Sequence, residues 1–130
     1  MVRALMLAFI IAAFGVAGAG LSTHGLVLAP EDGPLLAASE RAAAEWARYG
    51  ERVGTGKGAS VRVRWNPSLN LDGTPVAAAV YAAGDRIDVN SALYRPNVDC
   101  LWCAIFHEIG HLLGYDHGDD HYGLLIPRRT

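Results

Sequence analysis

Apolar side chains recur every three or four residues early in the chain, the spacing of one face of an α-helix. The apolar positions are Leu35, Ala38, Ala42, Trp46 and Tyr49. The polar positions between them are Glu40, Arg41, Glu45 and Arg48. Asp32-Gly33-Pro34 suits the start of this helix and Gly50 its end. We expect a scaffold helix here, with its polar side facing solvent.

Further along, apolar and polar residues alternate with a period of two, which predicts β-strands. Residues 61–65 and 86–90 alternate in this way, and residues 76–81 form a third predicted strand. Residues 21–32 fit either a linker or an early strand. Residues 54–58, GTGKG, lack the P-loop pattern, so we expect a flexible turn there.

A second helix is expected after the break at Pro96-Asn97, with Asp99 as its N-cap. Trp102 and Phe106 are four residues apart and are expected to pack in the core. The elements then follow the order helix, strands, helix. This order is typical of an α+β fold.

The first 21 residues contain one charge, Arg3, and a long apolar run. Ala17-Gly18-Ala19 has the form of a signal-peptidase site, so we expect residues 1–19 to be a signal peptide. The alternative is a membrane anchor, because the 18 residues from Ala4 to Leu21 can cross a bilayer. Both interpretations predict an exported protein, secreted in the first case and membrane-anchored in the second.

The rest of the chain is expected to comprise a linker, residues 20–33, and one domain, residues 34–130. Without Arg3, 10 of the 11 basic side chains remain against 13 acidic ones, a net charge of −3. These charges are dispersed and form no basic face. The composition therefore indicates no nucleic-acid partner.

The candidate chemistry lies in one stretch, Cys103–Asp120, which reads CAIFHEIGHLLGYDHGDD. His107 and His111 are four residues apart, so on a helix both imidazoles face one side and can bind one ion. Gly114 permits a left-handed turn that brings His117 back as a third ligand. Three protein ligands leave one coordination position open, as in catalytic zinc sites.

Glu108 follows His107 and points about 100° around the helix from it. It is expected to lie beside a zinc ion, within reach of a water molecule that the ion activates. Glu108 then accepts the proton of the attacking water and passes it to the leaving amine. This arrangement predicts a zinc-dependent endopeptidase acting on peptides or proteins.

The stretch from His107 to His117 resembles H-E-x-x-H-x-x-G-x-x-H, the signature of the metzincin zinc proteases, with the matrixin branch as the closest likeness. The resemblance implies three zinc ligands, His107, His111 and His117, and Glu108 as general base. It also implies a small twisted sheet with a scaffold helix and an active-site helix. One of the strands at 77–81 and 86–90 would be the sheet edge that holds an extended substrate.

Two departures from the matrixin pattern stand out. Matrixins have a methionine eight residues after the third histidine, where this chain has Leu125 within Leu124-Leu125-Ile126-Pro127. Leucine has a similar volume, and such exchanges usually cost under about 1.5 kcal/mol. No segment here corresponds to the wall of the specificity pocket and the final helix of matrixins. An alternative function is therefore a metal-binding or protein-binding domain that has lost catalysis.

The remaining candidates are given structural interpretations. We expect His121 to be a surface residue rather than a fourth ligand, Asp116 to stay off the metal, and His24 to be a linker residue. Cys100 and Cys103 form a single C-x-x-C, whereas a zinc ribbon needs two pairs. In an exported protein we expect a local disulfide, with two buried thiols or a redox pair as the alternatives.

Overall fold

The computed structural model describes residues 25–81, 83–118, 122–124 and 126. In this part of the chain two helices accompany a five-stranded sheet and a small hairpin, an α+β fold. In chain order the elements are β1 (Leu26–Pro30), α2 (Gly33–Ala47), β2 (Val53–Thr55), β3 (Val61–Trp65), β4 (Asn70–Leu71), β5 (Thr74–Pro75), β6 (Ala78–Val80), β7 (Arg86–Val89) and α3 (Leu101–Leu112).

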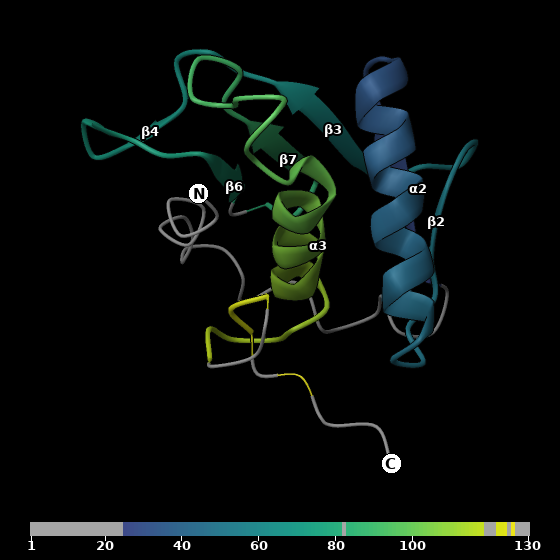
Figure 1. The fold of residues 1–130 in the computed structure, drawn as a ribbon. Helices are drawn as coiled ribbons and strands as arrows, with labels where there is room; N and C mark the ends of the chain where they lie inside the picture. The colour runs from purple at the N-terminus through teal and green to yellow at the C-terminus, as the bar shows by residue number, and fades with distance from the viewer. Residues whose placement is uncertain (1–24, 82, 119–121, 125, 127–130) are drawn as a thin grey trace.

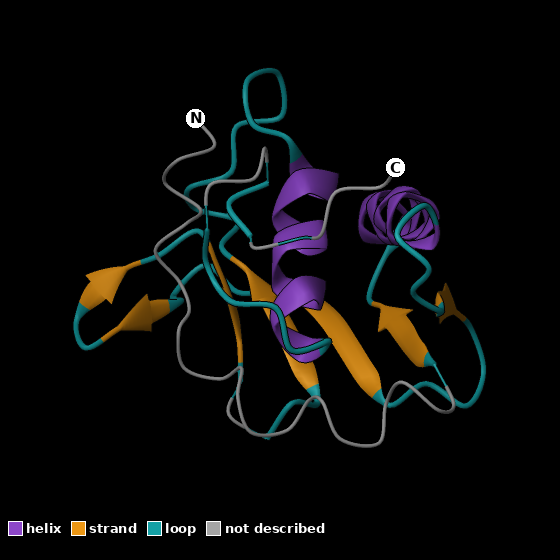
Figure 2. Ribbon diagram, turned by 90° about the horizontal axis from the view of Figure 1, so that it is seen from below, coloured by secondary structure: helices purple, strands orange, loops and turns teal. Residues whose placement is uncertain are grey.

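The sheet is mixed and has the strand order β2-β1-β3-β7-β6. Four neighbouring strands run parallel, and β6 pairs with β7 in the antiparallel sense. This order makes β6 an edge strand. The hairpin β4–β5 projects from the side of the molecule away from α2 (Figures 1 and 2).

The two helices cover different halves of the sheet and contact each other. α2 packs on β1 and β2, and α3 packs on β6 and β7. Figure 2 shows α3 lengthwise and α2 nearly end-on, so the helices cross at a steep angle. In Figure 1 the segment that follows α3 lies at the same end of the molecule as the C-terminal end of α2.

One hydrophobic core lies between the helices and the sheet. Alternate strand residues form one side of it, among them Val61 and Val63 of β3 and Ile87 and Val89 of β7. The helical side consists mainly of Leu35, Trp46, Ile105, Phe106, Ile109 and Leu112. Because both helices contribute to the same core, they cover the same face of the sheet, and α3 is fixed relative to α2.

The other face of β7 carries a buried acid. The carboxylate of Asp88 is fully buried and lies 3.0 Å from Nε of Arg64 and 3.1 Å from Nε of Arg86. The Asn66 amide and the Tyr81 hydroxyl donate to it at 2.8 Å and 2.9 Å. A buried carboxylate is tolerated when its hydrogen-bonding capacity is filled in this way. The cluster links β3 and β7 to the chain that follows β6.

The first predicted helix is confirmed as α2. Asp32 is its N-cap, with Oδ1 accepting a hydrogen bond from the backbone amide of Leu35 at 3.0 Å. The predicted apolar face is buried from Leu35 to Trp46. The prediction of a solvated Glu45 is wrong: only 6% of this residue is exposed, and it accepts a hydrogen bond from Tyr122.

The three predicted strands are confirmed as β3, β6 and β7, with β6 and β7 shorter than expected. The segment interpreted as a linker or early strand contains β1, which lies inside the sheet between β2 and β3. Residues 26–30 of the expected 20–33 linker are therefore part of the folded domain. The turn predicted at 54–58 begins later, since Gly54 and Thr55 belong to β2.

Residues 1–24 lie outside the described part of the chain, so the signal peptide or anchor stays a prediction. The same holds for the interpretations of His24, His121 and Leu125. Neither helix in the described ranges combines the length and apolarity that spanning a membrane requires.

Candidate metal centre

α3, which contains His107 and His111, begins at a disulfide bond. Cys100 and Cys103 form the predicted disulfide. Cys100 is also the N-cap, because its Sγ accepts from the backbone amide of Cys103 at 3.2 Å. The prediction of Asp99 as N-cap is wrong. Its carboxylate instead accepts from the backbone amide of Arg95 at 2.8 Å.

The predicted glycine turn ends α3 in a Schellman motif. Gly114 has a φ of +99°, a region that favours glycine. The amide of Tyr115 donates to the Gly110 carbonyl at 2.8 Å, and the amide of Gly114 donates to the His111 carbonyl at 3.1 Å. These bonds reverse the chain and bring the residues after Gly114 back toward the helix.

The reversal brings the three predicted ligands together. Nε2 of His111 lies 3.0 Å from Nε2 of His107 and 3.1 Å from Nε2 of His117. Two nitrogens bound to one tetrahedral zinc ion at about 2.0–2.1 Å are separated by about 3.3 Å. The spacing thus fits a single ion. His107 and His111 are buried and His117 is exposed, so the cluster faces solvent on the His117 side.

Hydrogen bonds define which nitrogen of two of these rings faces the cluster. Nδ1 of His107 donates to the Tyr122 carbonyl at 2.8 Å, and Nδ1 of His111 donates to the Tyr115 carbonyl at 2.9 Å. Carbonyl oxygens only accept, so each Nδ1 carries the hydrogen and each neutral ring has a lone pair on Nε2. Metal-binding histidines are oriented by such bonds in many proteins.

The rings are held in the neutral form that binds metals. Burial, together with a smaller effect of the neighbouring imidazoles, lowers the pKa of His107 to about 4 against the opposing effect of the Tyr122 carbonyl. Burial also lowers the pKa of His111 and of His117. At neutral pH two bare nitrogens of His107 and His111 therefore face each other at 3.0 Å. A shared cation would turn this repulsive contact into a favourable one.

Glu108 is fully buried, and its carboxyl group has no hydrogen-bond partner among the described residues. Burial raises the pKa of this carboxyl well above its usual value. Its oxygens are not part of the three-histidine cluster. Unpartnered buried carboxyl groups are costly, and proteins retain them most often where they take part in chemistry.

Other predicted positions are distinct from the cluster. Asp116 is exposed and is not grouped with the three histidines, and its interpretation as a non-ligand stays a prediction. Phe106 is buried and Trp102 packs against the core, as predicted.

The sequence did not reveal the contacts that hold α3 and the turn after it against α2 and the segment that follows α2. Trp46 of α2 stacks on Phe106 with ring centroids 4.2 Å apart, and its Nε1 donates to the Phe106 carbonyl at 3.0 Å. The hydroxyl of Tyr115 donates to Glu51 at 2.6 Å. Burial, with the added effect of this hydrogen bond, raises the pKa of Tyr115 to about 12. These contacts link positions about 60 residues apart, and no local pattern predicts them.

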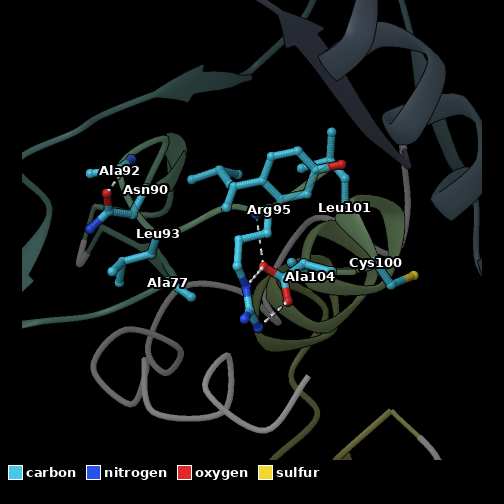
Figure 3. Close-up of a pocket in the computed structure, with 11 residues that line it drawn as sticks. Ala77, Asn90, Ala92, Leu93, Arg95, Cys100, Leu101 and Ala104 are labelled. Carbon is cyan, nitrogen blue, oxygen red and sulfur yellow. Dashed lines mark hydrogen bonds and ion pairs between the residues drawn. The ribbon is translucent and has the colours of Figure 1, made fainter. Parts of the chain in front are cut away.

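A separate pocket of about 380 Å³ lies beside the first turn of α3 (Figure 3). Its lining is mostly apolar, with Ala77, Leu93 and Leu101 among the lining residues, and the ion pair of Arg95 and Asp99 lies at its side. None of the three clustered histidines lines it. The cluster and this pocket are therefore different features, at opposite ends of α3.

In sequence comparisons, no protein family and no curated protein matches this chain.

Proposed function

We propose that this protein is an exported zinc-dependent endopeptidase with a metzincin-like fold. His107, His111 and His117 would hold the ion, and Glu108 would act as the general base. α2 would be the scaffold helix and α3 the active-site helix of such a fold. Export is supported by the N-terminal sequence alone, through its apolar run and Ala17-Gly18-Ala19.

The observation that carries this proposal is the convergence of three imidazole nitrogens, two of them with their tautomer defined by carbonyl acceptors. Three neutral histidines are a common ligand set of catalytic zinc. The bound ion supplies a Lewis acid that activates water and polarises a carbonyl. The donor set therefore suits both zinc and hydrolysis.

Glu108 has the properties of a base in such a site. It follows a ligand directly in the sequence, and its burial makes the carboxylate a stronger proton acceptor than an exposed one. In the proposed reaction an Oε atom of Glu108 takes the proton of the attacking water. The same atom then transfers the proton to the nitrogen of the leaving amine, and the peptide bond is broken without a covalent enzyme intermediate.

An edge strand supports a peptide substrate. β6 pairs only with β7 in the described sheet, so its outer edge can accept an extended chain by β-augmentation. Main-chain hydrogen bonds of this kind hold a peptide without regard to its side chains. We propose that substrates bind there.

One observation favours a second candidate, a metal-binding domain without catalysis. The Glu108 side chain is fully buried, whereas a general base must contact the reacting water. In this second case the histidines would bind metal and the carboxyl would stay protonated in the core.

The test combines metal analysis with peptide cleavage on the full chain. Glu108→Gln removes the basic oxygen at nearly constant volume, and Glu40→Gln is the control because Glu40 is an exposed glutamate of α2. We expect one zinc per chain in all three proteins, measured by elemental analysis. Cleavage of a mixed peptide library should fall by roughly 10²–10⁴ in Glu108→Gln only.

The other outcomes separate the candidates. Zinc binding by the parent protein without cleavage would leave the non-catalytic domain as the function. Absence of zinc would exclude both.

A further inference from the structure

The hydrogen bonds that orient the metal ligands continue to α2. The carbonyls of Tyr122 and Tyr115 accept from Nδ1 of His107 and of His111. The side chains of both tyrosines turn to the C-terminal end of α2. There the Tyr122 hydroxyl donates to Glu45 at 3.2 Å and the Tyr115 hydroxyl donates to Glu51 at 2.6 Å.

Four aromatic rings pack in the space between these two hydrogen bonds. The Tyr115 ring lies 5.1 Å from the Trp46 ring, and Trp46 lies 4.2 Å from Phe106. The Phe106 ring in turn lies 4.3 Å from that of Tyr122. The four rings form one row from Tyr115 to Tyr122, so neither tyrosine can shift alone. Figure 1 shows the C-terminal end of α2 and the segment that follows α3 at the same end of the molecule.

The two hydrogen-bond paths have the same construction. In each, a glutamate accepts from a tyrosine hydroxyl, and that tyrosine's carbonyl accepts from a histidine ring. Glu45 lies in the last turn of α2, and Glu51 lies in the segment between α2 and β2. The hydrogen bond to the carboxylate fixes the position of the tyrosine hydroxyl. Because the ring is rigid, it also restricts the position of the tyrosine backbone and of its carbonyl. A metal-binding imidazole depends on the position of its Nδ1 acceptor, because that acceptor sets the direction of Nε2.

We propose that Glu45 and Glu51 are positioning residues for the metal site, acting through Tyr122 and Tyr115 on His107 and His111. This inference rests on the proposed metal site. The bond between Glu51 and Tyr115 should have the larger effect. It is the shorter of the two, and Glu45 also pairs with Arg48 at 3.4 Å.

The decisive variant is Tyr115→Phe, which removes the hydroxyl and leaves the ring and the carbonyl in place. The matched control is Tyr81→Phe, which removes another hydroxyl hydrogen bond to a carboxylate, that of Asp88 at 2.9 Å. Both changes should lower stability, but only the first lies on a path to the metal. Glu51→Gln keeps an acceptor oxygen for the hydroxyl and is the conservative variant.

Two quantities are measured on the full chain. One is the dissociation constant of Zn²⁺, obtained by competition with a chromophoric chelator. The other is the visible absorption spectrum of the Co²⁺-loaded protein, which reports ligand geometry. Urea unfolding of the metal-free proteins accompanies both. We expect Tyr115→Phe to weaken Zn²⁺ binding by roughly tenfold and to change the Co²⁺ spectrum. Glu51→Gln should retain most of the affinity of the parent protein, and Tyr81→Phe should match the parent protein.

Three results would overturn the inference. Equal Zn²⁺ affinity and equal Co²⁺ spectra in Tyr115→Phe and the parent protein would contradict it and leave the proposed metal site intact. An equal loss of affinity in Tyr81→Phe would mean that general destabilisation explains the effect. Absence of metal binding in the parent protein would overturn both this inference and the proposed function. Loss of peptide cleavage with intact metal binding would count only against the peptidase.

Discussion

Glu108 is fully buried and its carboxyl group lacks a hydrogen-bond partner among the described residues, an unusual environment for a glutamate. It is a carboxyl group within the core, next to a histidine whose pKa is lowered to about 4. The opposite directions of the two pKa shifts have one cause, since burial favours the neutral form of each group. In the metal-free protein, burial therefore disfavours the charged form of both side chains.

The buried carboxyl predicts a pH-dependent effect of Glu108→Gln on the metal-free protein. The folded protein keeps the proton of Glu108 at pH values where the unfolded chain, with a pKa near 4.5, releases it. Its contribution to the free energy of unfolding therefore decreases as pH rises above 4.5. Glutamine has no such proton, so the variant should gain stability relative to the parent protein between pH 4 and pH 7.

Urea unfolding in the presence of a chelator measures this difference, with Glu40→Gln as an exposed control. The histidines titrate equally in both proteins, so they cancel in the comparison. A difference between variant and parent that stays constant over this pH range would contradict a raised pKa of Glu108.

At the scale of single residues, the sequence predicted the contacts between residues that are close to each other in the chain. His107 and His111 share a helix face because of their spacing, and Gly114 lies in the left-handed turn that the pattern required. The partners of these residues were not predictable. Tyr115 and Glu51 are 64 positions apart, and Tyr122 and Glu45 are 77 apart. Such pairs depend on the packing of α2 against α3, which no short pattern encodes.

At the scale of the elements, α3 makes an unusually close contact with its neighbours at Gly110. A Cβ atom at Gly110 would lie 2.5 Å from Cδ1 of Leu124 and 3.0 Å from Cζ2 of Trp46. Leu124 is fully buried and forms a β-bridge with His117. The lack of a side chain at Gly110 thus lets the segment after α3, which contains His117, pack against the helix.

Gly110→Ala is therefore expected to destabilise the protein, although alanine normally favours helices by about 1 kcal/mol over glycine. Overpacking of this kind costs typically about 1–3 kcal/mol. We expect a net loss of about 1 kcal/mol in thermal or urea unfolding. Zn²⁺ affinity should also decrease, because a displaced Leu124 moves the strand partner of His117.

Gly33→Ala provides the control, since a Cβ at this helical position in α2 meets nothing within 4 Å. It should leave stability unchanged or raise it. If Gly110→Ala were as stable as Gly33→Ala, the close contact of α3 with Leu124 and Trp46 would not be important for the fold.

Elements with a strongly periodic sequence pattern were predicted, and elements with a weak pattern were not. The alternation in β3 and the apolar face of α2 were confirmed because several residues carry each signal. β1 is short and mostly apolar, a pattern shared by linkers and buried strands. The N-cap of α3 was misassigned because Asp99 and Cys100 are adjacent and both can accept a hydrogen bond.

For the whole molecule, the three histidines join two parts of the chain. His107 and His111 belong to α3, whereas His117 lies in the segment after it. A bound ion would therefore connect helix and segment, and binding to the folded state alone stabilises a protein. At a free Zn²⁺ concentration of 100 times the dissociation constant, the gain is about 2.7 kcal/mol.

We accordingly expect removal of Zn²⁺ by a chelator to lower the melting temperature by about 10 °C for a domain of this size. Differential scanning calorimetry with and without Zn²⁺ measures the change. His117→Ala should show a much smaller difference, because this variant loses the ligand after α3. A melting temperature independent of Zn²⁺ in the parent protein would contradict the site.

The α+β class was predictable from the order of the elements, but the order of strands in the sheet was not. β1 pairs with β3 across α2 and β2, and β7 lies between β3 and β6. These pairings arise from the shared core under two crossing helices. No short pattern in the sequence predicts these strand pairings.

The position of α3 along the chain has a consequence for the order of events during synthesis. All five strands of the sheet, and α2, precede α3 in the chain. The ribosome therefore makes the residues of all five strands before it makes the first histidine of the cluster. Trp46 has no Phe106 ring to stack on until the first half of α3 has been made. The candidate metal centre is therefore among the last parts of the described fold to be synthesised, and an ion that needs all three histidines can bind only after His117 has been made.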